Sequence, residues 1–113
     1  MADHIKIRTA PGTWVVRAGG AVIAETTSAL ELAEGSYDPV IYFPRSGIGM
    51  AFLDKTETTS HCPHKGDATY FALSIKSGTI ADAGWSYEAP LPGMERIKDH
   101  IAFYPDKVTI EQL

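Results

Sequence analysis

The sequence predicts an all-β fold: a compact antiparallel sandwich or barrel-like single domain with one or two short helical turns. The first observation is a series of short apolar, β-rich segments that recur at regular spacing. The second is that turns rich in glycine and proline separate these segments, which is typical of sandwiches and barrels. The third is the length of 113 residues, which fits one domain, residues 1–113, and is enough for a core without disulfides.

Five strands are expected in the first half of the chain. At residues 5–8, isoleucine alternates with lysine and arginine, which indicates a strand with one buried face. Residues 14–17 and 21–24 flank a Gly-Gly turn and are expected to form a hairpin. Residues 29–34 contain good helix formers, but their apolar side chains alternate, so we favour a strand. Residues 40–43 form the fifth strand.

The second half also alternates strands and turns. The clearest strand is 69–76, where Tyr70 and Phe71 lie on opposite faces, so we expect Tyr70 to line a site and Phe71 to enter the core. The other expected elements are a short strand at 48–53, a polar turn at 54–58, a strand within 80–87, a helical turn at 94–98, and a closing hairpin of 101–104 and 108–110 across Pro105-Asp106.

Composition limits the classes of partner. The net charge of −4 and the pI of about 5.4 leave no dominant basic patch, so duplex nucleic acid is not an expected partner. The single cysteine excludes an internal disulfide and suits a reducing compartment. No signal peptide and no apolar run of membrane-spanning length is visible. We therefore expect a cytoplasmic protein that does not bind a membrane, and the oligomeric state stays open.

The reactive side chains concentrate between Tyr42 and Tyr70. This stretch opens with Tyr42-Phe43-Pro44-Arg45 and closes with the segment from Cys62-Pro63-His64-Lys65-Gly66 to Tyr70. It contains the only cysteine and two of the four histidines. Prolines at both corners place these residues on exposed turns.

The same motifs, together with Trp85-Ser86-Tyr87-Glu88-Ala89-Pro90 and Ala102-Phe103-Tyr104, resemble the family called domain of unknown function 427. The resemblance extends from about Trp14 to Ile110. It implies a compact, mostly β single domain and implies no activity, although a nucleotidyltransferase label is attached to the family name. The chain departs from the expected pattern at Gly47, where the resemblance leads us to expect an acidic residue.

Cys62 has two interpretations. It is a candidate nucleophile, since His61, His64 and Lys65 are close in sequence and a thiolate needs a nearby base or cation. Alternatively, it is a small side chain packed under the turn. His61, Cys62 and His64 are also ligand types for zinc, but structural zinc sites draw ligands from two separated segments, and the remaining histidines are isolated. We predict no metal site and no cofactor.

Arg45 and Lys65 are candidate anion-binding residues. Gly66 permits a turn that leaves Lys65 pointing outward beside free N–H groups, and the Arg45 guanidinium suits phosphate or carboxylate. The alternative is that both are solvated turn cations or pair with Asp67 and Glu88.

Aromatic residues fall in the same motifs and are expected either to line a pocket for a flat ligand or to pack in the core. They are Tyr42, Tyr70, Trp85, Tyr87 and Tyr104.

The preferred hypothesis is a domain that binds a small anionic or nucleotide-like molecule. Its expected ligand-binding residues are Tyr42, Arg45, Lys65, Tyr70, Trp85 and Tyr87. One alternative is an enzyme, of transferase or hydrolase type, that uses Cys62 or a tyrosine–lysine pair such as Tyr70 and Lys65, because a lysine lowers the pKa of a nearby tyrosine. Another is a protein-interaction domain with an exposed aromatic patch. In the preferred hypothesis, Arg45, Cys62, Lys65, Trp85 and Tyr87 converge.

Overall fold

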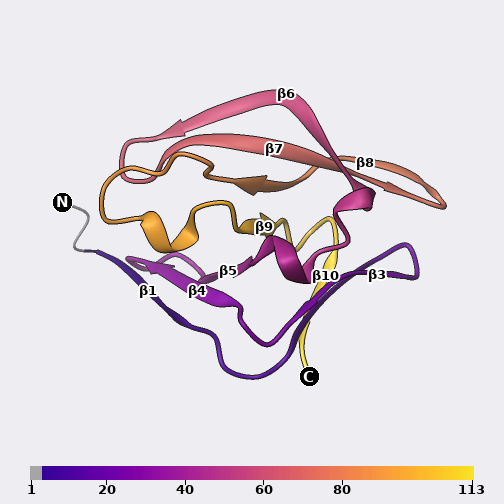
Figure 1. Ribbon diagram of the computed structural model, residues 1–113, viewed down its shortest axis with the longest axis horizontal. Coiled ribbons are helices and arrows are strands. Elements are labelled where there is room, and N and C mark those ends of the chain that lie inside the picture. Colours follow the sequence, from indigo (N-terminus) through magenta and orange to yellow (C-terminus); the bar gives the residue numbers. More distant parts are fainter. Residues whose placement is uncertain (1–3) are drawn as a thin grey trace.

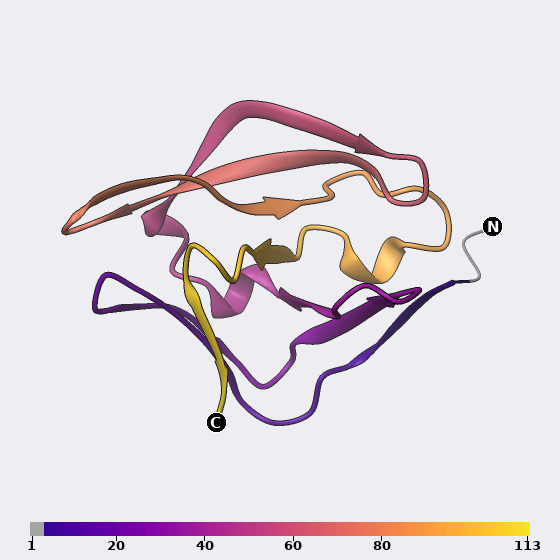
Figure 2. The ribbon, with the colours of Figure 1, turned by 180° about the vertical axis from the view of Figure 1, so that it is seen from behind.

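Two antiparallel sheets make up the fold, which confirms the predicted all-β class (Figures 1 and 2). The computed structural model describes residues 4–113. Its strands are β1 (Ile5–Thr9), β2 (Trp14–Ala18), β3 (Ala21–Thr26), β4 (Leu30–Glu34), β5 (Val40–Phe43), β6 (Leu53–Cys62), β7 (Gly66–Ile75), β8 (Gly78–Ser86), β9 (Ile101–Phe103) and β10 (Thr109–Gln112). Its short 3₁₀ turns are η1 (Arg45–Gly47), η2 (Met50–Phe52) and η3 (Glu95–Ile97).

The larger sheet has seven strands in the order β1-β4-β5-β9-β8-β7-β6, and the smaller sheet has three in the order β10-β2-β3. Figure 1 shows that the larger sheet is strongly curved: β6, β7 and β8 form one wall, β1 and β4 form the opposite wall, and β9 lies between them. Side chains distant in sequence can therefore meet across its concave side.

The apolar residues divide into two clusters. The larger cluster joins the two sheets and includes Val16, Ile23, Phe43, Phe71 and Phe103. The smaller cluster is built around Leu32, Tyr42, Tyr87, Ile97 and Ala102. Neighbours in a strand separate between the two, because successive side chains point to opposite faces of a sheet.

β7 shows this separation clearly. Phe71 belongs to the larger cluster and Tyr70 packs against the smaller one, as the alternation predicts. The same holds in β5 for Phe43 and Tyr42. We call these two sides of the larger sheet the core face and the pocket face.

Three details of the sequence-based prediction are wrong. Residues 54–58 are not a turn but belong to β6, a ten-residue strand whose polar side chains are exposed at the sheet edge. Residues 48–53 are not one strand, since Ile48 makes an isolated bridge to Ala24, η2 follows, and Leu53 already belongs to β6. The last two strands are not a hairpin, because β9 pairs with β5 and β8 whereas β10 pairs with β2 in the other sheet.

The predicted helical turn at 94–98 corresponds to η3, and the segment 29–34 contains the strand β4, as favoured. Within residues 4–113, no helix is long and apolar enough to cross a membrane.

Candidate functional site

A row of aromatic side chains crosses the pocket face. Tyr42 in β5 and Trp85 in β8 both lie opposite Ala102 in β9, and Trp85 in turn lies opposite Tyr70 in β7. Residues directly opposite each other in antiparallel strands share a face, so the register alone brings these rings together. The indole Nε1–H of Trp85 donates a hydrogen bond to the Tyr42 hydroxyl at 3.3 Å.

These rings border a pocket of about 240 Å³, which we call the tyrosine pocket. The chain contains five tyrosines, and all of them line this pocket: Tyr37, Tyr42, Tyr70, Tyr87 and Tyr104. The remaining lining residues are Leu32, Val40, Trp85, Glu34, Asp38 and Lys65. The pocket thus combines aromatic walls with two carboxylates and one ammonium group, which is the usual composition of a small-molecule site.

Lys65 reaches this pocket from the turn between β6 and β7. The Lys65 N–H donates to the Cys62 carbonyl at 3.3 Å, and Gly66 has a φ of +113°, so the tight turn predicted for this motif is present. The side chain, however, does not point outward. Lys65 is only 9% exposed, and its Nζ lies 2.7 Å from Glu34 Oε1 and 6.0 Å from the centre of the Tyr87 ring.

The Lys65–Glu34 pair fixes the charge at this end of the pocket. The hydrogen bond from Lys65 lowers the pKa of Glu34 and outweighs the opposing effect of burial. His4 Nε2 lies 3.5 Å from the other Glu34 oxygen. Lys65 is therefore neutralised by Glu34, and the expectation of a solvated lysine or of a Lys65–Asp67 pair is wrong.

Three tyrosines of the pocket, Tyr42, Tyr87 and Tyr104, have a raised pKa and therefore keep their protons. Burial raises the pKa of Tyr42 to about 12, despite the hydrogen bond from Trp85. Burial also raises the pKa of Tyr87 and that of Tyr104, with the neighbouring Tyr70 adding to the effect at Tyr104. These hydroxyls stay neutral at physiological pH and can donate hydrogen bonds.

The hydroxyls of Tyr70 and Tyr87 differ in their hydrogen-bond partners. The Tyr70 hydroxyl lies 3.0 Å from Ser60 Oγ. Among the described residues, the Tyr87 hydroxyl makes no hydrogen bond, although Tyr87 as a whole is 6% exposed. An unpaired hydroxyl at the wall of a pocket is available to a ligand.

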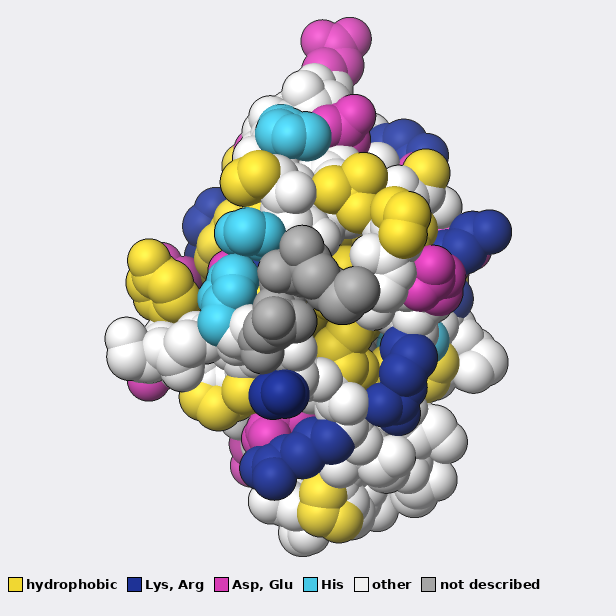
Figure 3. Space-filling model, turned by 90° about the vertical axis from the view of Figure 1, so that its left-hand side faces the viewer, with side chains coloured by type: hydrophobic (Ala, Val, Ile, Leu, Met, Phe, Trp, Pro, Cys, Tyr) yellow, Lys and Arg dark blue, Asp and Glu magenta, His cyan; other side chains and the backbone are white. Residues whose placement is uncertain are grey.

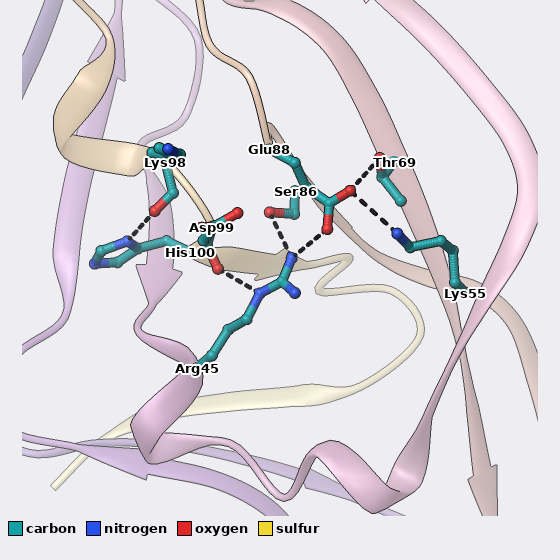
Figure 4. A network of polar contacts seen from close by, with 8 residues as sticks. All are labelled: Arg45, Lys55, Thr69, Ser86, Glu88, Lys98, Asp99 and His100. Carbon is teal, nitrogen blue, oxygen red and sulfur yellow. Dashed lines mark hydrogen bonds and ion pairs between the residues drawn. The ribbon is translucent and has the colours of Figure 1, made fainter.

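Arg45 lies elsewhere, in a polar network that we call the Arg45 corner (Figure 4). Its Nε donates to the Asp99 carbonyl at 2.7 Å, and one terminal nitrogen lies 2.9 Å from Glu88 Oε2 and 3.3 Å from Ser86 Oγ. Glu88 also accepts from Lys55 and Thr69, each at 3.2 Å. Burial opposes ionisation of Glu88, but the hydrogen bonds from Arg45, Lys55 and Thr69 hold its pKa below the usual value.

Arg45 and Lys65 do not come together, so the predicted convergence of Arg45, Cys62, Lys65, Trp85 and Tyr87 is not present. The Arg45 guanidinium lies 5.5 Å from the centre of the Phe71 ring, on the core face, whereas Lys65 lies over Tyr87 in the other cluster. Arg45 and Cys62 do not line the tyrosine pocket, while Lys65, Trp85 and Tyr87 do. The alternative pairing of Arg45 with Glu88 is the one present.

Cys62 is half-buried and packs against the smaller apolar cluster. The neighbouring His61 directs its ring to Asp67, with Nδ1 and Oδ1 2.7 Å apart, and His64 packs edge-on against His4 with 4.7 Å between ring centres. Histidine side chains gather on the face that Figure 3 presents. Within residues 4–113, no three His, Cys, Asp or Glu side chains form a group that could hold a metal ion.

Close packing explains why position 47 is glycine and not the acidic residue that the resemblance led us to expect. A Cβ atom at this position would lie 2.8 Å from the Glu25 carbonyl oxygen and 3.0 Å from Thr26 Cβ. Glycine here lets η1 approach the backbone of β3 closely. An acidic side chain at position 47 does not fit without movement of one of these segments.

Sequence reasoning missed five residues of the pocket: the apolar Leu32 and Val40, and the polar Glu34, Tyr37 and Asp38. For Glu34 a signal existed, because it follows Leu30 and Leu32 at the spacing of one strand face. Tyr37 and Asp38 lie in the connection between β4 and β5, where no periodicity marks an orientation.

Comparison with known proteins places the chain in a family. The family model NTP_transf_9, described as "Domain of unknown function (DUF427)", matches residues 6–112. The chain belongs to this family, in agreement with the resemblance of its motifs. No protein with curated annotation matches the chain.

Proposed function

We propose that this protein binds a small organic molecule with a flat apolar part in the tyrosine pocket. The observation that carries the proposal is that all five tyrosines of the chain line this one pocket. Aromatic rings provide a large apolar contact area, and their hydroxyls fix the orientation of a ligand.

Core packing accounts for only part of this set. Tyr42 is 1% exposed, and its hydroxyl accepts from Trp85, so it has a packing role. Tyr70, Trp85 and Tyr104 are only half-buried, and they leave a cavity between them. Half-buried aromatic rings around a cavity present apolar surface that a flat ligand can cover.

The shape of the pocket, and not a cationic centre, supports the proposal. A small anion would have to compete with Glu34 for Lys65, since these two groups are only 2.7 Å apart. Arg45 is already bound to Glu88 and to the Asp99 carbonyl. We therefore place the flat part of the ligand, rather than a negative charge, at the centre of recognition.

Indole serves as a neutral flat probe in a nuclear magnetic resonance titration of the amide and indole N–H groups. We expect saturable shifts at concentrations of about 1 mM, an affinity reasonable for so small a molecule. The shifts should centre on the Trp85 indole N–H and on the amides of Lys65 and Tyr87. Trp14→Phe assigns the two tryptophan signals.

A pair of hydroxyl deletions completes the test. Tyr87→Phe should weaken indole binding about threefold, because a hydroxyl without a partner is available to the ligand N–H. Ser74→Ala removes a hydroxyl that bonds only Asp54, far along β7, and should leave binding unchanged. Absence of saturable shifts, or shifts spread evenly over the surface, would overturn the proposal.

Catalysis by Cys62, Lys65 or Tyr70, a role in protein interaction, and the cytoplasmic location stay predictions from the sequence.

A further inference from the structure

A second pocket of about 360 Å³ adjoins the tyrosine pocket, and we call it the apolar pocket. Its walls are mainly apolar and come from both sheets: Trp14, Pro39, Ile41, Phe103, Pro105 and Ile110. Three residues line both pockets: Asp38, Val40 and Trp85. The two pockets therefore meet, and both the acidic Asp38 and the indole-bearing Trp85 line their junction.

The charges near this junction are unequally compensated. Glu31, at the apolar pocket, pairs with Arg8 at 2.6 Å, and Glu34, at the tyrosine pocket, pairs with Lys65. Across residues 4–113, no ion pair or side-chain hydrogen bond reaches the carboxylate of Asp38. The junction consequently carries one uncompensated negative charge.

This combination suits a cation. The face of an aromatic ring attracts an ammonium group, and tryptophan does so most strongly. A carboxylate at the same point adds direct ionic attraction and orients the charge. An anion at the junction would meet repulsion from Asp38, and Lys65, which lines the tyrosine pocket, is already paired with Glu34.

We propose that the ligand is a small amine: its flat ring occupies the tyrosine pocket, and its protonated nitrogen lies at Asp38, beside Trp85. A substituent on that nitrogen then extends into the apolar pocket. This inference rests on the proposed function, since it names the ligand class of the same pocket.

Three probes with the same indole ring test the charge. Tryptamine carries an ammonium group, tryptophol a neutral hydroxyl, and indole-3-acetate a carboxylate. We expect tryptamine to bind about tenfold more tightly than tryptophol, and indole-3-acetate to bind most weakly. Calorimetry or the same nuclear magnetic resonance titration measures the three dissociation constants, and the tryptamine advantage should shrink as salt is added.

A matched pair of acid-to-amide variants locates the charge. Asp38→Asn should remove most of the advantage of tryptamine over tryptophol while leaving tryptophol binding unchanged, which also shows that the pocket is intact. Glu57→Gln removes an exposed charge on β6, outside both pockets, and should change neither. An equal loss of tryptamine affinity in both variants would mean that only the net charge of the protein matters, and would overturn the assignment of Asp38.

A fourth probe, N-benzyltryptamine, tests the apolar pocket. We expect it to bind about tenfold more tightly than tryptamine, because its benzyl group buries apolar area against Ile41 and Ile110. Ile110→Glu should abolish this gain and leave tryptamine affinity unreduced.

The outcomes separate the two proposals. If tryptophol or indole-3-acetate binds in the tyrosine pocket as tightly as tryptamine, the proposed function stands and the amine inference is wrong. If none of the indole probes perturbs the pocket, both are wrong.

Discussion

Lys65 and Arg45 both lie at proline-led turns, and both pair with a glutamate, but their surroundings differ. Lys65 donates a hydrogen bond to one acidic partner, Glu34, and lines the tyrosine pocket. Arg45 bonds three groups, packs over Phe71 and lines no part of the tyrosine pocket. The Lys65 side chain is 11% exposed and that of Arg45 is 31% exposed, so the more buried cation is the one beside open space.

The difference teaches how to distinguish a structural cation from one at a binding site. Arg45 connects the end of β5 to the end of β8 and to the segment before β9, so its hydrogen bonds hold loops in place. Lys65 sets the charge and polarity of a pocket wall. Four predictions compare the Arg45 corner and its turn η1 with the tyrosine pocket, from the largest expected effect on stability to the smallest.

Arg45→Met should destabilise the protein by about 3 kcal/mol, because the buried Ser86 hydroxyl and the Asp99 carbonyl each lose a donor and Glu88 loses a charged partner. Thermal denaturation should show a melting temperature lower by roughly 12 °C. Arg8→Met breaks an ion pair in which the arginine is 76% exposed, and it should change stability by no more than about 0.5 kcal/mol. Similar losses in the two variants would contradict a structural role specific to the Arg45 corner.

Gly47→Asp should destabilise the protein by about 2 kcal/mol, since its Cβ would press on the Glu25 carbonyl and on Thr26. Chemical denaturation measures the free energy of unfolding. Ser46→Asp places the same charge one residue earlier and is the control, with an expected change below about 0.5 kcal/mol. A stabilised Gly47→Asp variant would show that this turn accepts an acid.

Lys65→Met should destabilise the protein by about 1 kcal/mol at neutral pH and flatten its acid dependence. Lys65 lowers the Glu34 pKa below the ordinary value of 4.5, so its stabilisation is present above that pH and is lost as pH falls through the lower, folded-state pKa. Denaturation curves at several pH values below about 5 measure this loss. The variant should lose less stability on acidification than the native chain, and parallel pH curves would contradict the coupling.

Tyr42→Phe and Tyr87→Phe should differ in their effect on stability, although both tyrosines line one pocket. Loss of the Tyr42 hydroxyl leaves the Trp85 N–H without its acceptor and should destabilise the protein by about 0.5 kcal/mol. Loss of the Tyr87 hydroxyl removes no hydrogen bond seen in residues 4–113 and should leave the melting temperature unchanged within about 1 °C. A larger loss in Tyr87→Phe than in Tyr42→Phe would assign the Tyr87 hydroxyl a structural role.

Much of the secondary structure follows from the sequence because its signals are local. The alternation around Tyr70 and Phe71 predicted the faces of β7, and the Gly-Gly turn predicted the β2–β3 hairpin. The polar composition of residues 54–58 led to the wrong prediction of a turn, since an exposed edge strand and a turn have similar compositions. The sequence-based prediction also failed for β9 and β10, because only the sheet order shows that these two strands belong to different sheets.

For the site, the sequence by itself determined that aromatic motifs recur at strand ends and that a tight turn presents Lys65. Only the tertiary structure decided that Lys65 pairs with Glu34, 31 residues away, and that Arg45 lies apart from it. The physical reason is that strand alternation depends on neighbouring residues, whereas the partner of a side chain depends on strand order and sheet curvature. Likewise, only the tertiary structure shows that Asp38 and Trp85 line the same two pockets, which no spacing in the sequence indicates.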